Sequence, residues 1–334
     1  MKVGVLGAGA IGTYVGAKLV LAGHHVVFVG RLGAEIAAHG IELSDHAGAH
    51  ERLEPARVRY VAEPGALADR EAILVTVKSM ATEDAARPLA SILKHRTTLV
   101  SLQNGVSNTP RLRALLPEHE VLAGMVPFNV VRTGPGHFHS GTDGPLAIEA
   151  RDGQEPAIAR ALREAGFEVQ ARADVEGVQW SKLIVNLNNA VNALSGVPIR
   201  AQLADRRYRL VMAACVREGL AATHAAGIRL ARVGKMIPAV APFMLALPDF
   251  VFFTAARVMV KIDPQAKSSM LDDLERGRVT EVDYLNGEIV RLAEKHGIPV
   301  PANRAIVALL KDAEAKHAGS PKIGAAELLA AVSA

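Results

Sequence analysis

The stretch that decides the fold of this chain is Met1–Gly16, which reads MKVGVLGAGAIGTYVG. An apolar run ends at Leu6, glycines follow at Gly7, Gly9 and Gly12, and a helical pattern comes next. In a G-x-G-x-x-G turn, the first glycine permits a tight turn, the second lets the backbone approach a pyrophosphate, and the third allows close packing of helix on strand. Glycine-rich turns also occur without a ligand, but the strand before this turn and the helix after it favour a dinucleotide site.

The rest of the first half alternates apolar runs with helical patterns. Unbroken apolar runs are typical of parallel strands covered on both faces, and their alternation with helices predicts a doubly wound sheet with right-handed crossovers. We expect strands at Val3–Leu6, His25–Val29, Ile73–Val77, Thr98–Ser101 and Val121–Val126, and helices at Ile11–Ala22, Ala34–His39, Thr82–Leu93 and Thr109–Leu115. A hairpin turn at Asp45–Gly48, a strand at His137–Ser140, and strands Leu146–Ala150 and Phe167–Gln170 around a helix Glu155–Ala165 complete this half.

Helical patterns dominate after Val175. The expected helices are Asp174–Leu194, Tyr208–Ala226, Phe250–Val260, Gln265–Glu275 and Glu281–His296, with Asp174 and Thr280 as N-caps and Gly227 and Gly297 at the C-terminal ends. The chain is therefore predicted to be an α/β protein. We expect an N-terminal Rossmann-like domain with the dinucleotide site at residues 1–172, followed by an all-α C-terminal domain at residues 173–334.

Composition excludes several classes of protein. The 334 residues carry 38 Lys and Arg against 34 Asp and Glu, without a basic run, so nucleic acid is not an expected partner. The single cysteine, Cys215, allows no internal disulfide and favours a reducing compartment. The apolar stretch Met236–Val260 contains three prolines, which disfavour a membrane span. We expect a cytoplasmic protein that binds neither nucleic acid nor membranes.

The end of the second strand indicates which dinucleotide is bound. NAD sites usually carry an acidic residue there, to bond the ribose 2′-hydroxyl. Here Gly30 and Arg31 follow the strand, and the first acid is Glu35. A guanidinium matches a 2′-phosphate, so Arg31 favours NADPH over NADH, although an arginine at this position can also be a solvated helix start.

Polar residues follow the next two strands. Lys78 comes after the third major strand, and Asn104 comes after the fourth. Ligands of open α/β sheets bind outside the carboxyl ends of strands, so both side chains are candidates for contact with the cofactor. A lone lysine at a strand end is more often solvated, so Lys78 alone is weak support.

A second polar group lies in the helical half. Lys182, Asn186 and Asn189 fall within about 60° of one another on a regular helix. Such groups are costly to bury unless they meet a ligand or one another, although they can also cap neighbouring helices. Ser269 and Glu281, further along, each fit an ordinary helix start.

Together these blocks resemble the ketopantoate reductase family (2-dehydropantoate 2-reductase). In the family's order they are GAGAIG at residues 7–12, VK at Lys78, QNG around Asn104, WSKLIVN at 180–186, SSML at 268–271 and GRVTEVDYLNG at 277–287. The resemblance implies a Rossmann domain, a helical domain, a substrate cleft between them, and NADPH-dependent reduction of 2-dehydropantoate to pantoate in pantothenate biosynthesis.

The resemblance also implies residue roles. Lys182 would donate the proton and contact the substrate, and Glu281 would contact the cofactor or the lysine; Asn104, Asn186 and Ser269 would hold the substrate. Ala190 stands where the family commonly has a second asparagine, so we take Asn189 in its place. The implied cofactor-binding residues are Gly7, Ala8, Gly9, Ala10, Ile11, Gly12, Arg31, Lys78, Asn104 and Glu281.

Two other functions stay open. Another NADP-linked 2-keto acid reductase or opine-type dehydrogenase would share the nucleotide half, and a non-catalytic NADPH sensor would not need the lysine and amides. No metal is expected, because His46 and His50 straddle Gly48 in a turn, and nothing in the sequence completes a site around His137 and His139. The apolar region Phe243–Phe253 is a candidate subunit contact for a homodimer.

Overall fold

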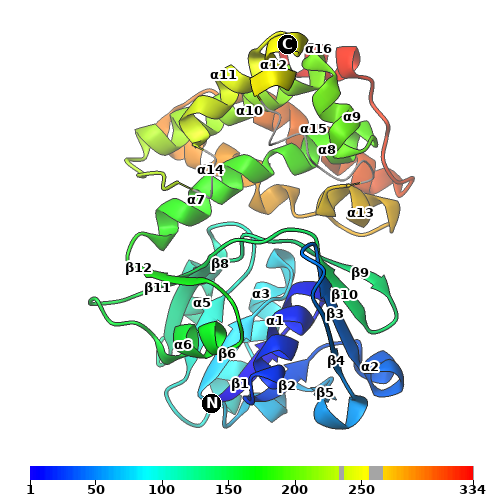
Figure 1. Ribbon diagram of the computed structural model, residues 1–334. Coiled ribbons are helices and arrows are strands. Elements are labelled where there is room, and N and C mark those ends of the chain that lie inside the picture. The colour runs from blue at the N-terminus through cyan, green and yellow to red at the C-terminus, as the bar shows by residue number, and fades with distance from the viewer. Residues whose placement is uncertain (233–236, 256–265, 334) are drawn as a thin grey trace. The chain divides into compact units, whose positions relative to one another are not determined.

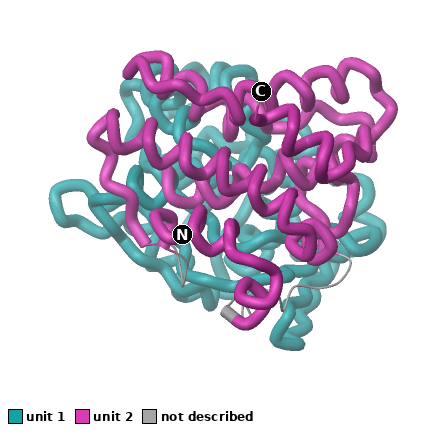
Figure 2. The backbone as a smooth tube through the Cα atoms, turned by 90° about the horizontal axis from the view of Figure 1, so that it is seen from above, with its two compact units in different colours: residues 1–179 teal, residues 180–334 magenta. Residues whose placement is uncertain are grey.

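The computed structural model describes residues 1–232, 237–255 and 266–333. The chain forms two compact units, Met1–Gln179 and Trp180–Ala334, coloured separately in Figure 2. No described helix is both long enough and apolar enough to cross a membrane.

Unit 1 is built on an eight-stranded sheet flanked by helices (Figure 1). Its strand order is β12-β11-β8-β7-β6-β1-β2-β5. β11 is antiparallel to β8, and every other neighbouring pair is parallel. The strands are β1 (Lys2–Leu6), β2 (His25–Val29), β5 (Arg59–Val61), β6 (Ala72–Val75), β7 (Thr98–Ser101), β8 (Glu120–Met125), β11 (Leu146–Glu149) and β12 (Val169–Arg172).

Alternate residues of the central strands enter two different cores. In β6, Leu74 packs with the cluster that contains α1 (Ala10–Leu21) and α6 (Ala157–Glu164), whereas Ile73 and Val75 pack with the cluster on α3 (Thr82–Ala86), α4 (Leu89–Ile92) and α5 (Asn108–Leu115). Helices therefore cover both faces of the sheet, which is why its strands are continuous apolar runs. The predicted doubly wound α/β fold is confirmed.

A second sheet in unit 1 has the order β4-β3-β10-β9. Its strands are β3 (Ile41–Asp45), β4 (His50–Leu53), β9 (Val130–Gly134) and β10 (His137–Ser140), and α2 (Gly33–His39) precedes it. The predicted turn between β3 and β4 is present: the Asp45 carboxylate accepts hydrogen bonds from the backbone N–H groups of Ala47 and Ala49, both at 2.9 Å.

The regular elements described in unit 2 are all helical. The 20-residue α10 (Arg206–Ala225) packs against α11, α14, α15 and α16, and the Asp205 carboxylate caps it by accepting from Arg207 N at 2.8 Å. The other helices are α8 (Asn188–Ser195), α9 (Ile199–Ala204), α11 (Ala241–Ala246), α12 (Asp249–Ala255), α13 (Ser269–Glu275), α14 (Asn286–His296), α15 (Pro301–Lys316) and α16 (Ala325–Ser333). The preceding helix, α7 (Val175–Asn186), begins in unit 1 and ends in unit 2.

Three predicted helices were wrong in extent. Thr82–Leu93 is divided into α3 and α4 because Pro88 has no N–H to continue the hydrogen-bond ladder. Asp174–Leu194 is divided into α7 and α8 at Leu187. Glu281–His296 begins with a short 3₁₀ turn, Val282–Tyr284, before α14, so Thr280 does not cap α14.

Two further helix predictions are confirmed in part. Gly227 and Gly297 do adopt left-handed conformations at helix ends, with φ of +70° and +66°. The expected helix Phe250–Val260 is present as α12, and its residues 256–260 lie outside the described part of the chain, as do Gln265 and Met236.

Candidate active site

The glycine-rich turn lies at the carboxyl end of β1, near the middle of the large sheet. β1 has β2 on one side and β6 on the other, so the strand order reverses at this point. Ligands of open α/β sheets bind at such a reversal. The N–H groups of Gly7 and Ala8 both donate to the Val29 carbonyl of β2 at 2.9 Å, which holds the turn against the neighbouring strand.

Each of the three glycines meets a different constraint. Gly7 has a φ of +86°, and a side chain there would overlap Val77. A side chain at Gly12 would overlap Thr76, so glycine lets α1 lie directly on the sheet. At Gly9, an added Cβ would find its nearest atom 3.9 Å away. This open space beside the first turn of α1 fits the pyrophosphate of a dinucleotide.

An arginine and a glutamate follow β2, and they differ in their contacts. Arg31 is exposed, and within the described part of the chain no hydrogen bond or ion pair engages it. The first acid, Glu35, is already occupied: its carboxylate accepts from Gly136 N at 2.8 Å and pairs with Arg132 of β9. Glu35 therefore holds α2 to the second sheet, and Arg31 presents a guanidinium for a bidentate anion contact.

The structure brings the Lys78 and Asn104 loops together. They follow the adjacent strands β6 and β7, and Lys78 is exposed whereas Asn104 is half-buried. The Ser79 hydroxyl donates to the Asn104 carbonyl at 3.2 Å, and the Asn108 side-chain amide donates to the same oxygen at 2.7 Å. Both predicted cofactor residues thus lie at the sheet edge that carries the glycine turn.

A buried polar network beneath these loops was not predicted from the sequence. The Gln103 amide donates to the Val77 carbonyl at 3.0 Å and to the Thr82 hydroxyl at 2.6 Å. The Thr82 hydroxyl is also 2.9 Å from the side-chain oxygen of Asn108. These hydrogen bonds fix the loops after β6 and β7. The sequence carries no direct signal for it, because its hydrogen bonds join the loops that follow two different strands.

Lys182 and Glu281 are electrostatically coupled within unit 2. Lys182 lies in the last part of α7, and Glu281 lies between α13 and α14. Burial lowers the pKa of Lys182 to about 8, and the Glu281 carboxylate opposes this shift. A lysine with such a pKa can give up a proton near neutral pH, as a general acid must.

The prediction that Lys182, Asn186 and Asn189 share one helical face assumed one continuous helix, and that assumption was wrong. Leu187 N donates to the Ile184 carbonyl at 3.4 Å, a three-residue spacing that tightens the chain between α7 and α8. Asn186 ends α7 and Asn189 belongs to α8, so uniform steps of about 100° do not relate them. Both asparagines are half-buried.

Ser268, rather than Ser269, caps α13. The Ser268 hydroxyl accepts from Leu271 N at 3.2 Å and donates to the Asn189 carbonyl at 3.1 Å. The side-chain oxygen of Asn192 accepts from Ser268 N at 2.9 Å. Ser269 is the first residue of α13 and is exposed, so its hydroxyl remains accessible to a ligand next to Asn189.

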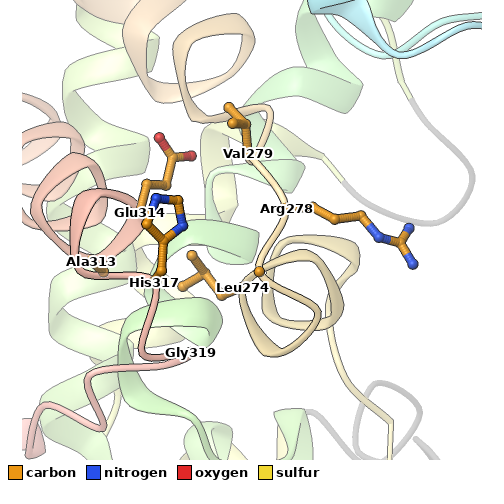
Figure 3. Close-up of a pocket in the computed structure, with 8 residues that line it drawn as sticks. Leu274, Arg278, Val279, Ala313, Glu314, His317 and Gly319 are labelled. Carbon is orange, nitrogen blue, oxygen red and sulfur yellow. The ribbon is translucent and has the colours of Figure 1, made fainter.

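The loop that carries Glu281 is held against α15. The Glu314 carboxylate accepts from both the N–H and the hydroxyl of Thr280, each at 2.7 Å. A small hollow lies beside this loop, and Figure 3 shows the Arg278 side chain pointing away from Glu314. The hollow is lined by Leu274, Gly277, Arg278, Val279, Ala313, Glu314, His317 and Gly319, none of which is a predicted site residue.

Comparisons with known proteins give a family match along most of the chain. Residues 3–153 match the family model described as ketopantoate reductase PanE/ApbA, and residues 174–314 match the model of its C-terminal part. A 2-dehydropantoate 2-reductase of Archaeoglobus fulgidus is 31% identical over 325 residues, which cover 94% of this chain and 98% of the relative.

Solved structures give the same result. The crystal structure of a PanE/ApbA family ketopantoate reductase from Ralstonia eutropha JMP134 has a TM-score of 0.81 and 34% identity, covering 95% of this chain and 99% of that one. D-mandelate dehydrogenase with NADH and anilino(oxo)acetate has a TM-score of 0.77 at 21% identity, covering 95% and 99%, and shares the fold. The two family models together span most of the sequence, and the chain belongs to the ketopantoate reductase family.

Proposed function

We propose that this chain is an enzyme that reduces 2-dehydropantoate to pantoate with NADPH, a step of pantothenate biosynthesis. The observation that carries the proposal is the lysine of α7, whose pKa is lowered to about 8 and which is coupled to Glu281. Two observations support 2-dehydropantoate as the substrate. This lysine lies in the family's WSKLIVN block, and the curated relatives are named 2-dehydropantoate 2-reductase.

The proposed reaction adds a hydride to the keto carbon and a proton to its oxygen. Bound NADPH supplies the hydride. The Lys182 ammonium stabilises the negative charge that develops on the keto oxygen and gives it a proton. Asn186 and Asn189 orient the substrate oxygens through their side-chain amides, and the Ser269 hydroxyl binds the carboxylate. Glu281 favours the protonated lysine before the transfer.

NADPH as the cofactor rests on the residues after β2. The Arg31 guanidinium binds the 2′-phosphate in this proposal, because Glu35 is occupied by Arg132 and Gly136 N. The residues that bind the dinucleotide are Gly7, Ala8, Gly9, Ala10, Ile11, Gly12, Arg31, Lys78 and Asn104, with Glu281 at the nicotinamide ribose. Residues 1–172 act as the cofactor domain, and residues 173–334 act as the substrate and catalytic domain.

We further propose a cytoplasmic homodimer. The one cysteine, Cys215, is buried, and burial raises its pKa, so the thiol is unreactive and suits a reducing compartment. Phe243 and Phe250 are 76% and 78% exposed on α11 and α12, and large exposed aromatic side chains are typical of subunit contacts. Size-exclusion chromatography with light scattering of Phe243→Ser tests the homodimer. We expect the variant to have the mass of a monomer, and a variant with the same mass as the parent rejects a subunit contact at Phe243.

One experiment separates the proposed function from its rivals. NADPH absorbance is followed with 2-dehydropantoate and a panel of other 2-keto acids, with and without an amine. Fastest turnover of 2-dehydropantoate is the expected result. A better substrate in the panel, or a requirement for an amine, identifies another keto acid reductase or an opine-type dehydrogenase. Tight NADPH binding without turnover of any substrate identifies a sensor.

A further inference from the structure

Three metal-ligating side chains meet on the four-stranded sheet of unit 1. Glu42, His50 and His137 come from β3, β4 and β10, which are neighbours in that sheet. Each offers one ligand atom, and these atoms all lie within 4.8 Å of one another. Within the described ranges, no other three His, Cys, Asp or Glu side chains have ligand atoms this close together. The sequence indicated no third ligand beside His137, and the structure brings Glu42 and His50 to it.

Strand register explains why these residues meet. Glu42 is directly opposite His137 of β10, and Ser44, two residues further along β3, is opposite both His50 and His139. Residues two apart on a strand share a face, so all five side chains lie on one side of the sheet. The intervening residues of β3 and β10 face the core instead, where Leu43 and Phe138 are buried.

An ion pair and two hydrogen bonds already hold these side chains together. His50 Nε2 is 2.6 Å from the Glu42 carboxylate. The Ser44 hydroxyl lies 3.0 Å from His137 Nε2 and 2.8 Å from His139 Nδ1. A metal-binding histidine usually hydrogen-bonds through its other ring nitrogen, which fixes the ring orientation. Ser44 can serve this purpose for His137.

The neighbouring cation does not neutralise the carboxylate. Arg52 is directly opposite Glu42 on β4, but its guanidinium donates to Glu54 at 2.9 Å and to the His39 carbonyl at 3.5 Å. Glu42 is half-buried and pairs with His50. The group therefore offers one negative charge and two imidazoles to a cation.

We propose that Glu42, His50 and His137 form a binding site for a divalent transition metal ion of the Zn²⁺ type. Two imidazoles and a carboxylate are a ligand set that zinc accepts, with water completing the coordination. Ligand atoms around tetrahedral zinc are about 3.3 Å apart, given metal–ligand distances of about 2.0 Å. Reaching that spacing would require rotation of the exposed His50 ring and its neighbours.

Binding at this site would cross-link three strands. Glu42, His50 and His137 are separated by up to 95 residues in the sequence, so the ion would hold distant segments of unit 1 together. A ligand that binds only the folded state stabilises it by mass action. The effect needs neither NADPH nor the lysine of α7, and it is therefore independent of the proposed function.

Isothermal titration calorimetry of the full chain without a histidine tag tests the site, with Zn²⁺ alone at neutral pH. The variants are His50→Ala and Glu42→Gln. The matched control is His46→Ala, because His46 is an exposed histidine in the turn beside β4 and pairs only weakly with Asp143, at 3.5 Å. We expect one equivalent to bind to the parent and to the control, and each variant to bind at least about tenfold more weakly.

Thermal unfolding gives a second measurement. Zn²⁺ should raise the Tm of the parent and of His46→Ala. The Tm of His50→Ala should not change when Zn²⁺ is added. His50 is exposed, so its replacement leaves the core intact, and circular dichroism verifies the fold of each variant. Equal zinc affinity in His50→Ala and the parent, or no binding to the parent at millimolar zinc, overturns the proposal.

Discussion

Burial lowers the pKa of Lys182 to about 8, and the carboxylate of Glu281 opposes that shift. The two residues are 99 positions apart in the sequence, and they interact because the end of α7 and the loop after α13 both lie in unit 2. Their coupling gives the proposed proton donor a protonation equilibrium close to physiological pH. The pH dependence of the reaction therefore reports on this pair.

The first prediction concerns that pH dependence. The donor is the protonated lysine, which is present below its pKa and lost above it, so kcat for keto acid reduction should fall as the pH rises through about 8. Glu281→Gln removes the charge that raises the pKa, so the fall should move to lower pH. Asp283→Asn is the control, because Asp283 pairs with Lys311 instead. Identical pH profiles for Glu281→Gln and the parent would contradict the coupling.

The second prediction concerns the choice of cofactor. Arg31→Ala should raise the KM for NADPH by at least about tenfold and change that for NADH little, because only NADPH carries the 2′-phosphate. Arg59→Ala is a matched control: Arg59 is also exposed, but it lies at the amino end of β5, the strand next to β2, whereas Arg31 follows the carboxyl end of β2. Equal losses with both cofactors in Arg31→Ala would show that the guanidinium does not bind the phosphate.

The third prediction compares two glycines of the same turn. Gly9→Ala should fold with nearly the parent Tm and lose NADPH binding, because the added methyl enters open space where the pyrophosphate is expected. Gly12→Ala should lose about 1–3 kcal/mol of unfolding free energy, because its methyl overlaps Thr76. Denaturant unfolding and NADPH fluorescence measure both effects. A strong loss of stability in Gly9→Ala would show that the space beside Gly9 is not open to an added methyl.

Local sequence was sufficient for much of the fold. The glycine turn, the buried strands and the Asp45–Gly48 hairpin are specified by residues near one another, and each was predicted close to its observed position. The division at Leu187 was not, because neither proline nor glycine marks it and only the tight bond to Ile184 reveals it. Long-range packing decides such positions.

For the candidate site, too, the sequence predicted some residues and missed others. Arg31 and the two loop residues Lys78 and Asn104 follow strands, so the strand order alone places them at one edge. The network around Gln103 and the meeting of His50 with His137 depend on side-chain contacts between distant segments. A single sequence carries no direct signal for either.

The most direct test of the central claim is the turnover of Lys182→Ala with 2-dehydropantoate and NADPH. A general acid contributes about 10²- to 10⁴-fold, so kcat should fall by that factor while NADPH binding is retained. Lys182→Arg should also be slow, because a guanidinium keeps the charge but does not release its proton. Turnover of Lys182→Ala within about tenfold of the parent would contradict the assignment of this lysine as the proton donor.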